Sequence, residues 1–193
     1  HGLSSALELL IVKSRDDAYN WAVWHEGLTS ADYALQLNTT IAQANTWDYW
    51  NDTAPSASVF SLGTDTGSNN STSDFIAYCF HSVEGYSKLG SYVGNAEPYA
   101  GTFTFTGFLP AFIMIKRISD VEDWVIMDNK RNTYNWVGNR LYPDLNNAEG
   151  SSATLDFLSN GFMMRSSNSI TNAASTYIYL AIAESPFKIS NAR

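Results

Sequence analysis

The sequence predicts an all-β protein built of two tandem jelly-roll or concanavalin-like β-sandwich units, and three observations support this prediction. Aromatic residues, which favour strands, make up 14% of the 193 residues. Small polar residues that favour turns are abundant, with 23 Ser, 15 Thr and 17 Asn. An internal repeat divides the chain in two. Because short strands joined by polar turns are typical of sandwiches and jelly rolls, we expect that architecture in each half.

The repeat is visible as a direct alignment of one segment with another. Leu9–Glu26 aligns without gaps with Phe112–Asn129, and Trp21 falls on Trp124 at an offset of 103 residues. Matches further along the chain lie in the same order at an offset of 102. Several matching blocks in one order are hard to obtain by chance. We therefore expect the two halves to be related by duplication.

Each half should consist of short strands, within units that span residues 1–93 and 94–193. The boundary is placed at residues 94–101 (GNAEPYAG), which contain Gly and Pro and little apolar surface. In both units a short apolar run ends in cations, and a polar loop and a Trp-led run follow, which predicts a hairpin. Period-two alternation at Thr102–Thr106 is typical of a strand with one face in the core. The expected strands are Leu9–Lys13, Trp21–Trp24, Phe75–Phe80, Thr102–Thr106, Phe112–Arg117, Trp124–Met127 and Tyr177–Ala183.

Trp21 and Trp124 hold the same position in the two units, at the start of a strand after a polar loop. A tryptophan at a duplicated register is expected to anchor the core of its unit. If the units are independent modules, truncation of Trp124 should unfold the second unit and leave the melting transition of the first unchanged.

Composition excludes several classes of function. The net charge is −8 and the chain has no cluster of Lys or Arg, which argues against nucleic acid as a partner. No apolar run approaches the roughly 18 residues of a spanning helix, so we expect no membrane insertion. The single Cys79 excludes an intrachain disulfide and a structural zinc site. The chain also lacks a G-x-S-x-G elbow and a phosphate-binding loop, so we expect no enzyme activity.

The acidic residues nearest one another are Asp120, Glu122 and Asp123, on a predicted loop. We interpret this loop as a solvated hairpin tip and expect no cofactor. Calcium is the alternative, since carboxylate oxygens on a loop suit that ion, but the loop lacks the EF-hand spacing.

Two aromatic clusters are candidates for contact with a glycan or with another subunit. The first is Trp47, Tyr49 and Trp50, and the second is Tyr134, Trp136 and Tyr142. Aromatic faces flanked by Asn, Asp and Arg can stack on sugars, and the same residue types are enriched at protein interfaces. Alternation along a strand would put Trp47 and Tyr49 on one face and Trp50 on the other, so at least one of these faces is expected in the core.

Several long segments carry a resemblance to a known family. They are YCFHSVEGYSKLGSYVGN (Tyr78–Asn95), GTFTFTGFLPAFIMIKR (Gly101–Arg117), LDFLSNGFMMR (Leu155–Arg165) and TYIYLAIAESPFKISNAR (Thr176–Arg193). These segments resemble modules in virion proteins of tailed bacteriophages, usually called tail-fibre-like or concanavalin-like (lectin/glucanase-like) domains. The resemblance implies a β-sandwich, a place on the virion and no known catalysis. One departure is that the first unit lacks the leading strand that Gly101–Phe108 supplies to the second, which leaves one sheet edge without a cover.

We therefore expect a non-enzymatic structural protein of a phage virion: a segment of a tail fibre, an appendage or a capsid decoration, with a role in host-surface attachment. A carbohydrate-binding adhesin is the alternative, and a glycan-degrading enzyme is a weaker one. The expected partners are other virion proteins, a host-surface glycan, and further copies of the chain in a trimer or a symmetric array. Because the chain opens with His1 and not with Met, we expect it to be processed or to be a segment of a longer polypeptide.

Overall fold

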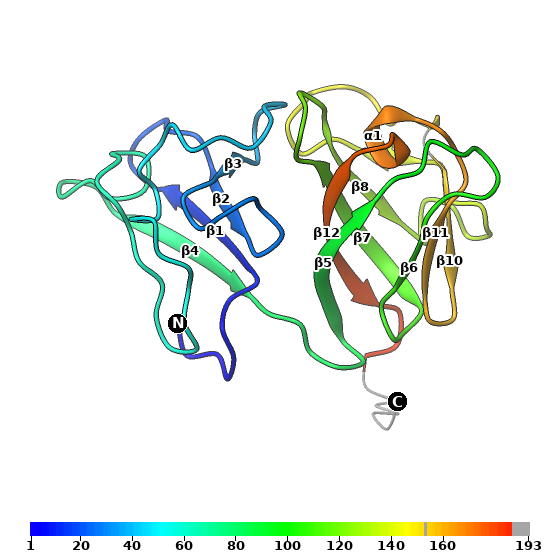
Figure 1. The fold of residues 1–193 in the computed structure, drawn as a ribbon, viewed down its shortest axis with the longest axis horizontal. Helices are drawn as coiled ribbons and strands as arrows, with labels where there is room; N and C mark the ends of the chain where they lie inside the picture. The colour runs from blue at the N-terminus through cyan, green and yellow to red at the C-terminus, as the bar shows by residue number, and fades with distance from the viewer. Residues whose placement is uncertain (153, 187–193) are drawn as a thin grey trace.

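The computed structural model describes residues 1–152 and 154–186, and the regular secondary structure in this part is almost entirely β-strand, joined by long loops (Figure 1). The prediction of an all-β fold is confirmed. Antiparallel strands form three sheets. The four-stranded sheet has the order β3 (Leu35–Gln36), β2 (Ala22–His25), β1 (Leu9–Ser14) and β4 (Phe75–Phe80). The five-stranded sheet has the order β5 (Ser87–Val93), β12 (Thr176–Ala183), β7 (Pro110–Arg117), β8 (Trp124–Asp128) and β9 (Arg140–Leu141). The three-stranded sheet has the order β10 (Leu155–Leu158), β11 (Gly161–Met164) and β6 (Phe103–Phe105), and one short helix, α1 (Ser169–Asn172), precedes β12.

The three sheets are stacked, with the five-stranded sheet in the middle (Figure 1). Alternation along its strands shows how both of its faces are used. On β7, Ile113 and Ile115 pack in the core shared with the three-stranded sheet. Met114, between them, packs in the core shared with the four-stranded sheet. The middle sheet is therefore buried on both faces, which explains why Phe112–Ile115 is an uninterrupted apolar run.

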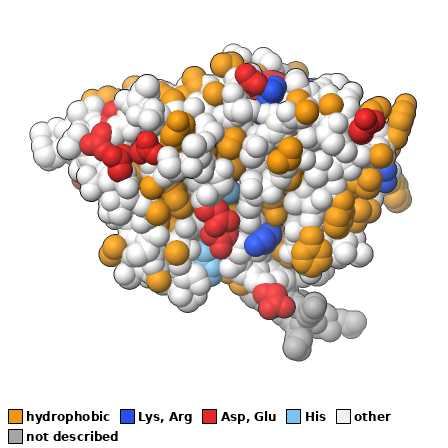
Figure 2. Space-filling view, viewed as in Figure 1, with side chains coloured by type: hydrophobic (Ala, Val, Ile, Leu, Met, Phe, Trp, Pro, Cys, Tyr) orange, Lys and Arg blue, Asp and Glu red, His pale blue; other side chains and the backbone are white. Residues whose placement is uncertain are grey.

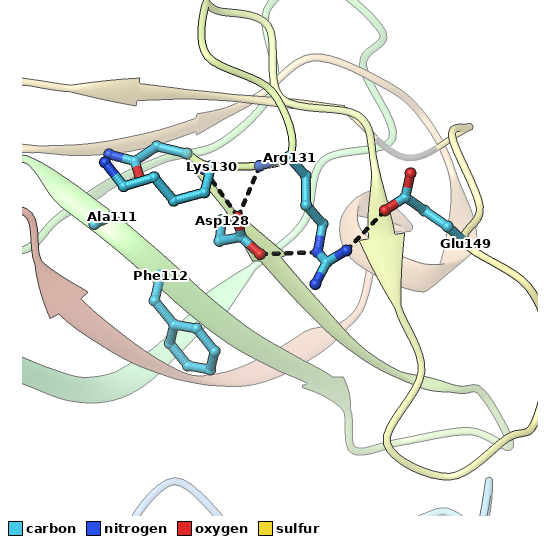
Figure 3. A pocket seen from close by; sticks show the side chains of 7 residues that line it. Ala111, Phe112, Asp128, Lys130, Arg131 and Glu149 are labelled. Atoms are coloured by element: carbon cyan, nitrogen blue, oxygen red, sulfur yellow. Dashed lines mark hydrogen bonds and ion pairs between the residues drawn. The ribbon is translucent and has the colours of Figure 1, made fainter.

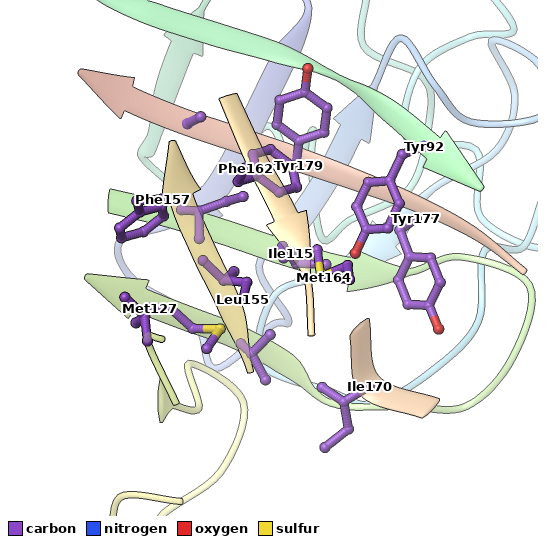
Figure 4. Packing of buried hydrophobic residues seen from close by; sticks show 14 of the residues in the cluster. Tyr92, Ile115, Met127, Leu155, Phe157, Phe162, Met164, Ile170, Tyr177 and Tyr179 are labelled. Atoms are coloured by element: carbon purple, nitrogen blue, oxygen red, sulfur yellow. The ribbon is translucent and has the colours of Figure 1, made fainter. Parts of the chain in front are cut away.

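The core between the five- and three-stranded sheets is rich in aromatic side chains (Figure 4). Tyr92 and Tyr177 stack with ring centroids 5.0 Å apart, and Phe162 meets Tyr179 edge to face at 5.2 Å. The buried Tyr92 hydroxyl donates to the carbonyl of Thr171 at 2.6 Å. Because this carbonyl belongs to α1, the helix supplies an acceptor that the aromatic core needs.

The strand registers of the two halves agree with the offsets of the repeat. Leu9 of β1 pairs with His25 of β2, and Phe112 of β7 pairs with Asp128 of β8, so both partners lie 103 residues further on. The pairing of β1 with β4 recurs between β7 and β12 at offsets of 103 and 102 residues. A common register is what an internal duplication predicts, and the duplication itself stays a prediction.

The unit boundaries differ from those predicted. Strand β5 lies before the predicted boundary at residue 94, yet it pairs with β12 in the five-stranded sheet. The chain therefore crosses between the two sheets in residues 81–86. The two halves also share a core, in which Leu9 and Val23 of the first half pack with Trp124 and Leu180 of the second. The expectation of two sandwiches with separate cores is replaced by three layers, because the second face of the middle sheet is apolar and the first half covers it.

Two ionisable side chains are buried near this shared core. Burial lowers the pKa of His25 to about 4, while its Nδ1 accepts a hydrogen bond from the Gly27 amide at 2.9 Å. Burial also lowers the pKa of Lys116 to about 8, although the Lys116 ammonium donates to the Arg117 carbonyl at 2.7 Å. Packing the sheets together therefore disfavours charge at both positions.

Trp124 is buried, as the sequence predicts, while Trp21 is half buried. The Trp124 indole lies between two sheets and donates from Nε1 to the carbonyl of Gln36, in the other half of the chain, at 3.0 Å.

Trp124→Ala should cost on the order of 3–5 kcal/mol of the free energy of unfolding. Because the two halves share this core, we expect Trp124→Ala to melt in a single transition at a lower temperature than the wild type. Calorimetry would check this, with Trp136→Ala as the exposed control; an unchanged transition from the first half would contradict the shared core.

His25 should make the protein less stable as the pH falls. The unfolded chain protonates His25 near its ordinary pKa of 6.5, whereas the folded protein does so only near pH 4. The unfolded state therefore binds more protons in this window, and the free energy of unfolding decreases from pH 6.5 toward pH 4, by roughly 3 kcal/mol in total. Urea titrations from pH 7 to 4 would measure the loss in the wild type and in His25→Gln. Equal losses in the two proteins would contradict the assignment.

Candidate functional site

The three-stranded sheet presents an apolar outer face. On β6 the side chains of Phe103 and Phe105 are 45% and 63% exposed, whereas Thr104 and Thr106 point inward. The predicted strand at Thr102–Thr106 therefore has one face in the core, and that face carries the threonines. Figure 2 shows hydrophobic side chains gathered on the side of the molecule that carries this sheet. Exposed aromatics on one face are typical of a contact surface.

Beside this face lies an open pocket of about 490 Å³, which we call the Trp136 pocket. Its lining comes from four separate parts of the chain: Tyr99 from the loop between β5 and β6, Trp136 from the loop before β9, Thr154 and Asp156 from the β10 region, and Arg165 from the end of β11. Side chains in β10 alternate, so Leu155 and Phe157 enter the core and Asp156 points outward. The pocket thus combines two aromatic rings with an acid, a cation and a hydroxyl.

An ion pair fixes the polar side of the Trp136 pocket. The Arg165 Nε lies 2.5 Å from Oδ2 of Asp156, and its Nη1 donates to the carbonyl of Tyr99 at 3.0 Å. The guanidinium has five N–H donors in a rigid plane. These two contacts use only part of that set, so Arg165 can still donate to a polar ligand.

Backbone contacts on both sides fix the position of Trp136. The Asn135 side chain donates from Nδ2 to the carbonyl of Phe157 at 2.8 Å, and its Oδ1 accepts from the Phe157 N–H at 3.0 Å. On the other side, the Val137 N–H donates to the carbonyl of Leu155 at 2.7 Å. The indole is 60% exposed and lies over Gly138, where a Cβ atom would come within 2.9 Å of Cζ3. The backbone that carries the indole is therefore held in place before any ligand arrives, which lowers the entropy cost of binding.

The two aromatic clusters predicted from the sequence differ in how far their side chains are exposed. Tyr134 is exposed but does not line the pocket, and Tyr142 is half buried with the guanidinium of Arg140 5.3 Å from its ring centre. Tyr49 and Trp50 are 3% and 2% exposed. These two cannot stack on a glycan from outside, so the expectation of contact is wrong for them. The physical reason is that they cover the second face of the four-stranded sheet. Trp47 is half buried and stacks on Tyr49.

The residues of the acidic loop contact neighbouring parts of the chain. In residues 1–152 and 154–186, no group of three His, Cys, Asp or Glu side chains could hold a metal ion. Asp120 forms an ion pair with Arg117, and the Glu122 N–H donates to the carbonyl of Thr40. Burial raises the pKa of Asp123, and the neighbouring Glu122 adds to this effect. Calcium binding stays a prediction without a donor set in this part of the chain.

A second hollow, of about 700 Å³, lies at the turn after β8 (Figure 3). Arg131 stands between two carboxylates there, 2.9 Å from Asp128 and 3.0 Å from Glu149. The N–H groups of Lys130 and Arg131 donate to the other oxygen of Asp128. Arg131 therefore holds both carboxylates of this hollow in ion pairs, and no described side chain there is an exposed aromatic ring like that of Trp136. The ion pairs found in the described residues all lie between Arg117 and Arg165.

Sequence reasoning missed Tyr99, Asp156 and Arg165. Tyr99 and Arg165 are 66 residues apart, and no local pattern links them. The one usable signal was the alternation in Leu155–Leu158, which places Asp156 on the outer face.

A family model described as "Domain of unknown function (DUF7483)" matches residues 1–186. No curated protein and no solved structure matches the chain significantly. Among the described residues, no helix is long and apolar enough to cross a membrane.

Proposed function

This chain belongs to the DUF7483 family, and we propose that it is a non-enzymatic structural module of a tailed-bacteriophage virion that contacts surface glycans through the Trp136 pocket. The observation that carries the glycan contact is the fixed, exposed indole of Trp136 beside the Arg165–Asp156 pair. Sugars present C–H faces that stack on aromatic rings and hydroxyls that pair with carboxylates and guanidinium groups.

Support for a place on the virion comes from the resemblance of Tyr78–Asn95 and the later segments to phage virion modules. The stacked sheets also suit a structural part, because they bury both faces of the middle sheet and leave only outer surfaces for contacts. A tail fibre, an appendage and a capsid decoration all fit these observations.

The composition of the pocket favours binding over hydrolysis of a glycan. A retaining glycosidase uses two carboxyl groups about 5 Å apart, and an inverting one uses two that are farther apart. Asp156 is the one carboxylate among the described residues that line the Trp136 pocket, and Arg165 is paired with it. An adhesin that acts without the rest of a virion is the alternative function for the same site.

Purified particles of the phage that encodes the chain would test the structural role. Mass spectrometry should detect the chain at a fixed copy number per particle, and labelled antibodies viewed by electron microscopy should decorate one part of the particle. Absence of the chain from particles that remain infectious would reject the structural proposal and favour the adhesin.

A glycan array, followed by affinity measurements with glycans at up to millimolar concentration, would test the site. Trp136→Ala should weaken binding roughly tenfold or more, equivalent to about 1.4 kcal/mol, because the stacking face is lost. Tyr134→Ala is the matched control, since Tyr134 lies in the same loop and is more exposed but does not line the pocket. Equal affinity of the wild type and Trp136→Ala, or no binding to any glycan, would reject the site.

A further inference from the structure

Strand β4 is the outer strand of the four-stranded sheet, and within residues 1–152 and 154–186 it pairs only with β1. Its six residues, FIAYCF, carry no charge. The Arg15 N–H donates to the carbonyl of Asp74 at 2.8 Å, which shows which residues of β4 bond to β1. Because antiparallel ladders alternate, the N–H and C=O groups of Phe75, Ala77 and Cys79 point away from β1. Natural proteins usually protect such an edge with charges, Pro or a bulge.

The equivalent strand in the five-stranded sheet has a second partner. Strand β12 pairs with β7 in the register in which β4 pairs with β1, and β5 covers its other side. The Gly94 N–H donates to the carbonyl of Ser175 at 2.9 Å, and the Ala183 N–H to that of Tyr86 at 2.8 Å. By alternation the residues of β12 that bond to β5 are Tyr177, Tyr179 and Ala181. They are the residues 102 positions after Phe75, Ala77 and Cys79.

Side-chain exposure shows the same difference between the two strands. Ile178 and Leu180 of β12 are 2% and 8% exposed, and Leu89 of β5 lies opposite Leu180. Their counterparts on β4, Ile76 and Tyr78, are 39% and 41% exposed. The first sheet therefore has an apolar edge, whose backbone groups have no partner among the described residues, at the place where the second has a strand.

We propose that the β4 edge binds an extended strand of a partner chain that carries the side-chain pattern of β5. Transfer of the β5–β12 register predicts how the partner lies, antiparallel to β4. A small residue, as at Gly90, would face Ala77; a large apolar residue, as at Leu89, would face Tyr78. An aromatic residue, as at Tyr92, would face Phe75. Backbone bonds would supply the affinity and these alternate side chains the specificity.

A synthetic peptide with the sequence of residues 85–95 (GYSKLGSYVGN) tests the proposal on the whole protein. We expect millimolar peptide to slow amide exchange at Phe75, Ala77 and Cys79 at least tenfold, as measured by NMR. The amides of Ile76 and Tyr78 already face β1 and serve as the internal reference. The same peptide with Pro in place of its central Gly should have no effect.

Two variants of the protein keep the test falsifiable. Ala77→Pro removes an N–H that points to the open edge, so the variant should fold and lose the peptide effect. If Ala77→Pro does not fold, Tyr78→Lys takes its place as the test variant. It puts a charge on the edge and should weaken binding of the peptide at least tenfold. Tyr134→Ala, far along the sequence, should bind like the wild type.

Three results would overturn the proposal. In the first, the peptide slows exchange at none of the three outward amides. In the second, exchange at these amides slows in the protein alone as its concentration rises, which would mean that two copies pair through β4. In the third, the peptide lowers protection at Tyr177 and Tyr179, which would mean that it displaces β5 from its own sheet.

Discussion

Burial of both faces of the five-stranded sheet is the constraint on which the rest of the structure depends. Strands β7 and β12 send alternate side chains into two different cores, so neither strand has a face left for solvent. Polar groups in these layers must then be paired or neutral, and the Tyr92 hydroxyl, His25 and Lys116 each follow this rule in a different way. The helix α1 meets the same need, since its carbonyls accept hydrogen bonds from the hydroxyls of Tyr92 and Tyr177 in the aromatic core.

Contacts with other molecules are consequently left to the two outer layers. The three-stranded sheet carries the exposed rings of β6 and the Trp136 pocket, and the four-stranded sheet carries the open edge of β4. Figure 1 shows these sheets on opposite sides of the middle one. The two proposed contact surfaces therefore lie apart, so occupation of one would leave the other open.

The all-β fold was predictable because strands β1, β2, β7 and β8 are short apolar runs with polar loops between them. The repeated segments also contain equivalent hairpins, β1 with β2 and β7 with β8. The stacking was not predicted, since local alternation does not show which sheet covers a given face. The apolar run of β7 was a usable signal for burial on both sides. Alternation at Thr102–Thr106 predicted a strand but not that the rings would face outward. The pocket depends on contacts between residues far apart in sequence, such as Tyr99 and Arg165, which no local pattern encodes.

The placement of the ion pairs has a consequence for behaviour in salt. All those found in the described residues lie in the second half of the chain, and they are partly exposed. The first half has neutral hydrogen bonds, such as those from Asn20 to Gln36 and from Gln43 to Thr29, and carboxylates that accept from neutral groups, such as Asp48 from Thr64. Dissolved ions screen exposed charges beyond about 8 Å at physiological ionic strength, and an exposed pair contributes at most about 1 kcal/mol. Amide and hydroxyl pairs carry no net charge to screen, so added salt should weaken the ion pairs of the second half more than these neutral pairs of the first.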